Sequence, residues 1–199
     1  MPDQQLNTGA LTVSDTGHIT TKESVWYHYR QVGARSINLG ASGATLVIPA
    51  TKGANATLGG LHLDNAPSDE YLYFDADVHN DWDAASDIIV EVYFEIETAG
   101  GGAGQTCVLD LETYHKQKTA STSRGQSLTA STIVGTGAAA EMFEASFAID
   151  YDSGTDPVLM DDMLSFRLWW DDDTSTDPTH PIVHHVEILY KANKPRIEV

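Results

Sequence analysis

The chain has 199 residues, with 29 acidic side chains against 11 basic ones, a net charge of −18 and a single cysteine. So acidic a surface repels phosphate backbones, which excludes nucleic acid as an expected partner, and one cysteine excludes an internal disulfide. No stretch approaches the roughly 18 consecutive apolar residues of a membrane-spanning helix, so no membrane partner is expected, and the first ten residues lack the pattern of a signal peptide.

The first 24 residues are polar and rich in turn-forming residues. Residues 11–13 and 18–20 have the composition of a small hairpin, with Gly17 able to take a positive φ between them. A two-stranded hairpin is marginal in water by itself. We therefore expect residues 1–24 to form an arm that docks on the main domain, on a neighbouring subunit or on a larger assembly.

Three strands are expected next, at residues 25–32, 44–48 and 56–63, the last with a bulge or bend at Gly59 and Gly60. A turn then leads into what reads as a central pair of strands around residues 71–97. The second of these shows a period of two, in which one row faces a core and the other faces water or a partner. The apolar row consists of Ile88, Val90, Val92, Phe94 and Ile96.

The second half of the chain repeats this pattern. A glycine-rich, hairpin-like connection at 99–104 precedes a strand at 106–114, where Cys107 reads as a small buried hydrophobe rather than a nucleophile. Residues 116–127 read as a surface loop, and at most a short helix is expected near Ala138. Further strands are expected at 131–134, 141–149, 163–170 and 182–191, separated by acidic loops.

About eight or nine strands spaced by turns indicate a β-sandwich or barrel. Composition gives no reason to divide residues 25–191, which we predict to be one sandwich domain between the arm (1–24) and a C-terminal tail (192–199).

Five features follow one another in a characteristic order. They are a Trp-Asp turn at Trp82 and Asp83, the long alternating strand after it, the late strand 164–170, an acidic loop and a final strand at 186–190. This order resembles that of a family of tailed-phage virion proteins with a jelly-roll-like domain, over roughly residues 67–191. The resemblance implies a structural virion component, such as a capsid decoration protein, a head fibre or a tail-associated module, often trimeric and without a catalytic motif.

Closely spaced carboxylates could supply the oxygen ligands that Ca²⁺ prefers. The densest set is Asp75, Asp77, Asp81 and Asp83, and the alternative is a solvated turn capped by Asp side chains, with Trp82 packed over the end of the sandwich. A second acidic set, Asp171, Asp172, Asp173 and Asp177, has the same two interpretations. His180, His184 and His185 are poorer zinc candidates, because neighbouring strand residues point to opposite faces.

No nucleophile elbow, phosphate-binding loop or dinucleotide fingerprint is present, and a pair of carboxylates at glycosidase spacing would arise by chance among so many acids. We therefore expect no enzyme and no required cofactor. Aromatic residues on the predicted strands offer binding surfaces instead, or simply pack under loops. They are Trp26, Tyr27, Tyr29, Tyr93, Trp169 and Trp170.

We predict a jelly-roll-like antiparallel β-sandwich that acts as a capsid decoration protein on the exterior of a virion. Its partners would be the major capsid protein and further copies of itself in a homotrimer, contacted through Ile89, Tyr93 and Trp169. The alternative is a carbohydrate- or receptor-binding module of a tail or fibre.

Overall fold

The computed structural model describes residues 4–6, 11–13, 19–21, 25–33, 37–39, 44–49, 53, 56–64, 70–78, 82–177 and 179–192. Every regular element among them is a β-strand, so the predicted all-β class is confirmed. The described part of the chain offers no helix that could serve as a membrane span. Near Ala138 the chain makes a turn instead of the short helix that we allowed for, closed by a bond from the Glu141 N–H to the Ala138 carbonyl.

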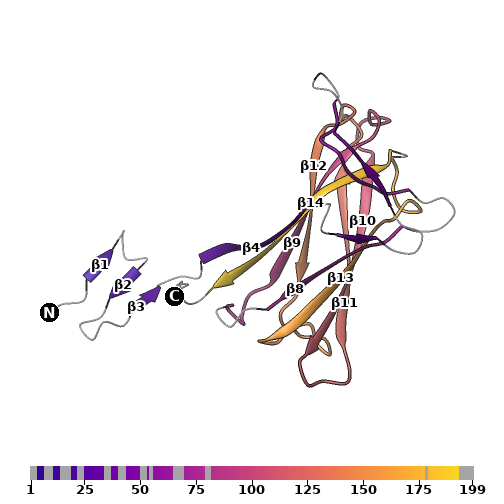
Figure 1. Ribbon diagram of the computed structural model, residues 1–199. Coiled ribbons are helices and arrows are strands. Elements are labelled where there is room, and N and C mark those ends of the chain that lie inside the picture. The colour runs from indigo at the N-terminus through magenta and orange to yellow at the C-terminus, as the bar shows by residue number, and fades with distance from the viewer. Residues whose placement is uncertain are drawn as a thin grey trace.

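Two antiparallel sheets form the body of the molecule (Figure 1). The strands of the first sheet, in spatial order, are β11 (Arg124–Ile133), β10 (Thr106–Gln117), β13 (Asp162–Trp170), β8 (Leu72–Asp77) and β5 (Asn38–Leu39). The second sheet consists of β12 (Met142–Ile149), β9 (Ile88–Ile96), β14 (Pro181–Ala192), β7 (Gly60–His62) and β6 (Thr45–Val47), with β4 (Val25–Gly33) paired to β14.

The pairing of the last eight strands is that of a jelly roll. β7 pairs with β14, β8 with β13, β9 with β12 and β10 with β11, so the first strand pairs with the last and each inner pair nests within it. Two packed sheets made from such a rolled antiparallel ribbon define the jelly-roll architecture. The predicted fold is therefore confirmed from the strand order itself.

The same order corrects two local expectations. Strands β8 and β9 were expected as a central pair, but they lie in opposite sheets. The glycine-rich segment 99–104 likewise joins β9 to β10 across the two sheets rather than closing a hairpin. Sequence periodicity shows which face of a strand is buried, but not which strand lies beside it.

The core lies between the sheets, where the apolar rows of both layers meet. All five even-numbered residues of β9 are at most 3% exposed, as their period of two predicted. From the other sheet, Phe166 of β13 stacks on Phe74 of β8, with ring centroids 4.8 Å apart and planes 16° apart. Truncating such a buried aromatic side chain costs about 3–5 kcal/mol of stability.

The N-terminal hairpin is present as β2 (Leu11–Val13) and β3 (Ile19–Thr21), and β1 (Gln4–Leu6) adds a third strand beside β2. Figure 1 shows this three-stranded sheet apart from the sandwich, beyond the end of β4. The C-terminal tail lies outside the described residues, except for the end of β14.

Two expected boundaries were wrong. The strand expected at 56–63 begins only at Gly60, after the bend that was expected at this glycine pair, where Gly59 has a φ of 80°. A side chain at position 59 would also meet the Val47 carbonyl oxygen at 2.6 Å. The loop expected at 116–127 is shorter, because β10 continues to Gln117 and pairs through His115 with Arg124 at the start of β11. Polar residues at the ends of β10 and β11 hid this second pairing from a search for apolar alternation.

Candidate functional site

The outer face of the five-stranded sheet carries an ordered array of aromatic and polar side chains. Because residues that face one another across antiparallel strands lie on the same side of the sheet, the register defines rows that run across it. One row joins Tyr73, Arg167, Glu112 and Ser127. The rows on either side of it contain Trp169, Asp110 and Thr129, and Asp75, Ser165, Tyr114 and Gly125.

Arg167 lies at the centre of this array. Its guanidinium forms an ion pair with Glu112, and its Cζ atom lies 4.8 Å from the ring centroid of Tyr71 and 5.4 Å from that of Trp169. Burial alone would lower the pKa of Arg167, but the neighbouring Glu112 carboxylate outweighs this effect and the pKa is raised. A permanently charged Arg167 therefore holds the two rings and the acid in one fixed arrangement.

The three aromatic rings on this part of the sheet are inclined to one another. Tyr71 and Trp169 meet edge to face, with centroids 5.8 Å apart and planes 67° apart, and Tyr71 and Tyr73 are 6.4 Å apart at 44°. All three are partly exposed, so their rings are accessible from solvent. We call Tyr71, Tyr73, Glu112, Tyr114, Arg167 and Trp169 the aromatic face.

Tyr114 continues the aromatic face towards the turn that joins β10 to β11. Its hydroxyl donates to the Glu112 carboxylate, and this bond, followed by partial burial, raises the pKa of Tyr114. Beside it lies an open hollow of about 240 Å³. The hollow is lined by residues of β10, of β11 and of the turn between these two strands, together with Asp156. Most of this lining is polar.

Gly125 allows the two strands to approach closely next to this hollow. A side chain at position 125 would place its Cβ 2.1 Å from the backbone oxygen of Thr113. No flexible group could move aside there, because the obstacle is backbone. Gly125 therefore serves the geometry of the site rather than chain flexibility.

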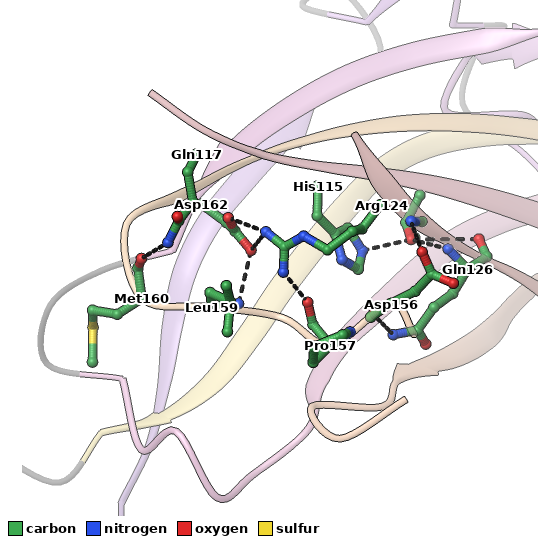
Figure 2. Close-up of polar contacts among 11 residues, drawn as sticks. His115, Gln117, Arg124, Gln126, Asp156, Pro157, Leu159, Met160 and Asp162 are labelled. Atoms are coloured by element: carbon green, nitrogen blue, oxygen red, sulfur yellow. Dashed lines mark hydrogen bonds and ion pairs between the residues drawn. The ribbon is translucent and has the colours of Figure 1, made fainter. Parts of the chain in front are cut away.

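Arg124, Gln126 and Asp156, which line the hollow, belong to a partly buried polar network (Figure 2). Arg124 donates to both carboxylate oxygens of Asp162, at 2.7 and 3.0 Å, and the Asp162 side chain is fully buried. Asp162 also accepts from the Leu159 N–H at 2.7 Å, while Arg124 bonds the carbonyl of Pro157. This ion pair fastens the loop after β12 onto β10 and β11.

Further contacts of Gln126, Asp156 and His115 extend the network. Gln126 bonds the backbone of Asp150 in both directions, at 2.7 and 3.0 Å, and the Gly125 N–H donates to Asp156 at 3.2 Å. His115 is buried 2.7 Å from the hydroxyl of Thr113, and burial lowers its pKa, so it is neutral in the folded protein. The sequence-based analysis missed this network, because it treated residues 116–127 and 150–162 as loops.

The three predicted contact residues do not share one surface. Ile89 and Tyr93 project from β9 on the outer face of the second sheet, whereas Trp169 projects from β13 on the outer face of the first. Tyr93 stacks on His185 with centroids 4.5 Å apart, and its hydroxyl donates to Glu91. A flat partner surface could therefore contact Ile89 and Tyr93 together, but not Trp169 as well.

The predicted calcium ligands are only partly brought together. Asp75 and Asp77 lie on β8 with their side chains exposed, Asp83 lies in the turn before β9, and Asp81 is outside the described residues. Trp82 is 1% exposed and donates to the Ser86 carbonyl at 3.1 Å, so it closes the end of the sandwich as the alternative interpretation proposed.

The second acidic set has structural partners. Asp177 is buried and accepts from the N–H groups of Gly101 and Thr179, both at 3.0 Å. Burial would raise the pKa of Asp177, but these bonds outweigh it and the pKa is lowered. Asp171 accepts from Thr174 within its own turn. Asp171 and Asp177 therefore serve as turn and loop anchors.

The three histidines named as poor zinc candidates are separated. His184 lies 3.3 Å from the buried Glu95, and His185 stacks on Tyr93. His180 instead meets His62 and Glu97, a combination that the sequence analysis did not consider. These three residues are far apart in the chain, and only the pairing of β7, β14 and β9 brings them together.

Of the remaining aromatic candidates, Trp170 is 6% exposed and belongs to the core. The side chains of Trp26, Tyr27 and Tyr29 are outside the described part of the structure. Tyr71 and Tyr73, which the sequence analysis did not select, complete the aromatic face with Trp169. The sequence could have identified both tyrosines, because they alternate with the apolar residues Leu72 and Phe74 and therefore lie on the outward row.

No family model matches the sequence, and no curated protein does. Among solved structures, a xylan-binding module, CBM15, aligns with 86% of this chain and all of its own, at 14% identity and a TM-score of 0.40. A second, CBM35 from Cellvibrio japonicus Abf62, aligns with 87% of this chain and all of its own, at 10% identity and a TM-score of 0.36. At these scores neither likeness bears on what this chain binds, and the fold class is defined by its own strand order as a jelly-roll β-sandwich.

Proposed function

We propose that the protein is a non-catalytic glycan-binding module whose binding surface is the aromatic face. The observation that supports this most directly is the adjacency of Tyr71, Tyr73 and Trp169 to the Arg167–Glu112 pair. A sugar ring presents an apolar face of C–H groups and a rim of hydroxyls. Aromatic rings pack on the apolar face of the sugar, and fixed charged or amide groups form hydrogen bonds with its hydroxyls.

The inclination of the rings indicates the form of the glycan. Flat crystalline polysaccharide would need coplanar rings, whereas planes 44° and 67° apart suit single sugar rings in a chain or a branched oligosaccharide. The net charge of −18 and the acids beside the rings, Asp75, Asp110 and Glu112, disfavour sulfated or uronic ligands. The expected ligand is therefore a neutral, soluble glycan.

The test is a glycan array followed by calorimetric titration of the best neutral ligand. We expect Trp169→Ala and Tyr73→Ala each to weaken binding by about tenfold, the equivalent of about 1.4 kcal/mol. Tyr93→Ala is the matched control, since this tyrosine is also partly exposed on a central strand but lies on the opposite face. Binding that is retained in Trp169→Ala, or the absence of any saturable glycan, would refute the proposal.

The capsid decoration function stays a second proposal, with the major capsid protein as partner and a homotrimer as the assembly. The feature that favours it is the separate sheet β1–β3, which Figure 1 shows beyond the sandwich, where it could attach to a particle. Jelly rolls occur in both viral capsid and lectin domains, so the fold suits either function. Light scattering distinguishes them in part, because a clean monomer at micromolar concentration would contradict the trimer.

A further inference from the structure

Three potential metal ligands meet at one end of the six-stranded sheet, away from the aromatic face. His62 ends β7, Glu97 follows β9, and His180 precedes β14, which lies between the other two strands. The Glu97 N–H donates to the His180 carbonyl at 3.0 Å, so the backbone fixes this approach. Among the described residues, this is the one group of three or more His, Cys, Asp or Glu whose ligand atoms could hold an ion.

The distances suit a small ion. The Nε2 atom of His62 lies 3.4 Å from the Glu97 Oε2, and the Nδ1 atom of His180 lies 3.5 Å from the same oxygen. Ligands about 2.0–2.1 Å from a tetrahedral Zn²⁺ are separated from one another by about 3.3 Å. All three ligand atoms lie within 4.8 Å of one another, so small rotations of the side chains would close the set.

The surroundings of His180 favour the same conclusion. Its second ring nitrogen, Nε2, lies 3.9 Å from the Asp64 Oδ1, so a small rotation of either side chain would bring the two within hydrogen-bond distance. A carboxylate on the far nitrogen of a metal-binding histidine orients the ring and raises its basicity. The Asp64 backbone is in turn fixed by a bond from its N–H to the Glu70 carboxylate at 2.8 Å. Trp170 packs against the His180 ring, with centroids 5.0 Å apart.

We propose that His62, Glu97 and His180 form a binding site for a divalent transition metal, with Zn²⁺ as the ion that fits best. Two imidazole nitrogens and one carboxylate oxygen suit zinc and its neighbours, whereas Ca²⁺ takes six to eight oxygens. Glu97 is 51% exposed, so one coordination position stays open to water. The ion would join the segments next to β7, β9 and β14, and binding would stabilise the fold. This inference does not depend on glycan binding.

The test is a calorimetric titration of Zn²⁺ at pH 7.5 into the full chain, free of any histidine tag. We expect one tight site per chain, a rise in Tm with added Zn²⁺, and visible absorption from Co²⁺ in the same site. His180→Gln and Glu97→Gln should each weaken Zn²⁺ binding by at least tenfold, and Asp64→Asn by about tenfold.

His185→Gln is the matched control, because His185 is, like His180, a partly exposed histidine next to a carboxylate, here that of Glu187. It should bind Zn²⁺ as the parent does. Glu97 is exposed, so its variant is expected to fold even if the His180 variant does not, and far-UV circular dichroism checks both. Zn²⁺ binding that survives in Glu97→Gln, or that shows no saturation at one equivalent, would overturn the proposal.

Discussion

The buried ion pair between Arg124 and Asp162 gives the sharpest test of the structure. Replacing Arg124 by Met keeps most of the aliphatic stem and removes the charge. Asp162, whose side chain is 0% exposed, then keeps only the bond from the Leu159 N–H among the three bonds that the structure gives its carboxylate, since both Arg124 bonds are lost. Arg124→Met therefore leaves a carboxylate inside the protein without a cation.

The expected loss of stability is large for the replacement of one partly exposed residue. Removing one partner of a buried pair costs about 3–5 kcal/mol, because the remaining charge is uncompensated. The Arg124 side chain is 21% exposed, so water replaces part of its effect and we expect the lower end, about 3 kcal/mol. For a chain of this size that lowers Tm by about 6–12 °C.

Urea unfolding followed by far-UV circular dichroism measures this loss. Lys116→Met is the matched control, since Lys116 is an exposed cation on the same strand pair, and its replacement should change stability by less than about 0.5 kcal/mol. In Arg124→Met/Asp162→Asn the uncompensated charge is absent, so the two changes should be clearly non-additive. A loss below about 1 kcal/mol for Arg124→Met would refute the reasoning.

Two further predictions concern buried titratable groups. Burial, reinforced by Asp177, raises the pKa of the Cys107 thiol to about 12, so Ellman's reagent should not react at pH 8 until guanidinium unfolds the chain; reaction of the native protein would contradict its burial. Burial lowers the pKa of His115 in the folded protein. On acidification the unfolded chain therefore takes up a proton at this histidine at a higher pH than the folded protein does, and the free energy of unfolding should decrease as the pH drops below about 6.5. His115→Gln should reduce this dependence between pH 7 and 5, as urea unfolding at each pH would show, and an unchanged dependence would mean that His115 is not the neutral buried group described above.

Much of the architecture followed from local sequence. The alternation from Ile88 to Ile96 placed every core residue of β9 correctly, because the side chains of a strand alternate between faces whatever its neighbours are. The same rule assigned Cys107 to the core and identified the late strand ending at Trp170. The alternation was wrong for Glu95, which it predicts to be exposed on the outward row. The Glu95 side chain is only 2% exposed, because the Leu58 N–H and His184 cover it.

The candidate sites were much harder to predict. Trp169 was selected from the sequence, but its neighbour Tyr71 was not, because it comes near Trp169 only through the pairing of β8 with β13. Arg167 lies two residues before Trp169 on the same face of β13, so the alternation that selected Trp169 could have identified it too. The calcium set stays a prediction, since Asp75 and Asp77 lie on a strand, Asp83 lies beyond it and Asp81 is outside the described residues.

By itself, the sequence determined that the chain is a sandwich of strands and which residues of strands such as β9 and β13 face its core, because a period of two acts within a single strand. Only the tertiary structure decided which strands lie side by side, and with them the aromatic face, the Arg124–Asp162 pair and the meeting of His62, Glu97 and His180. The physical reason is that the register between distant strands depends on the packing of the whole core, which no short stretch of sequence encodes.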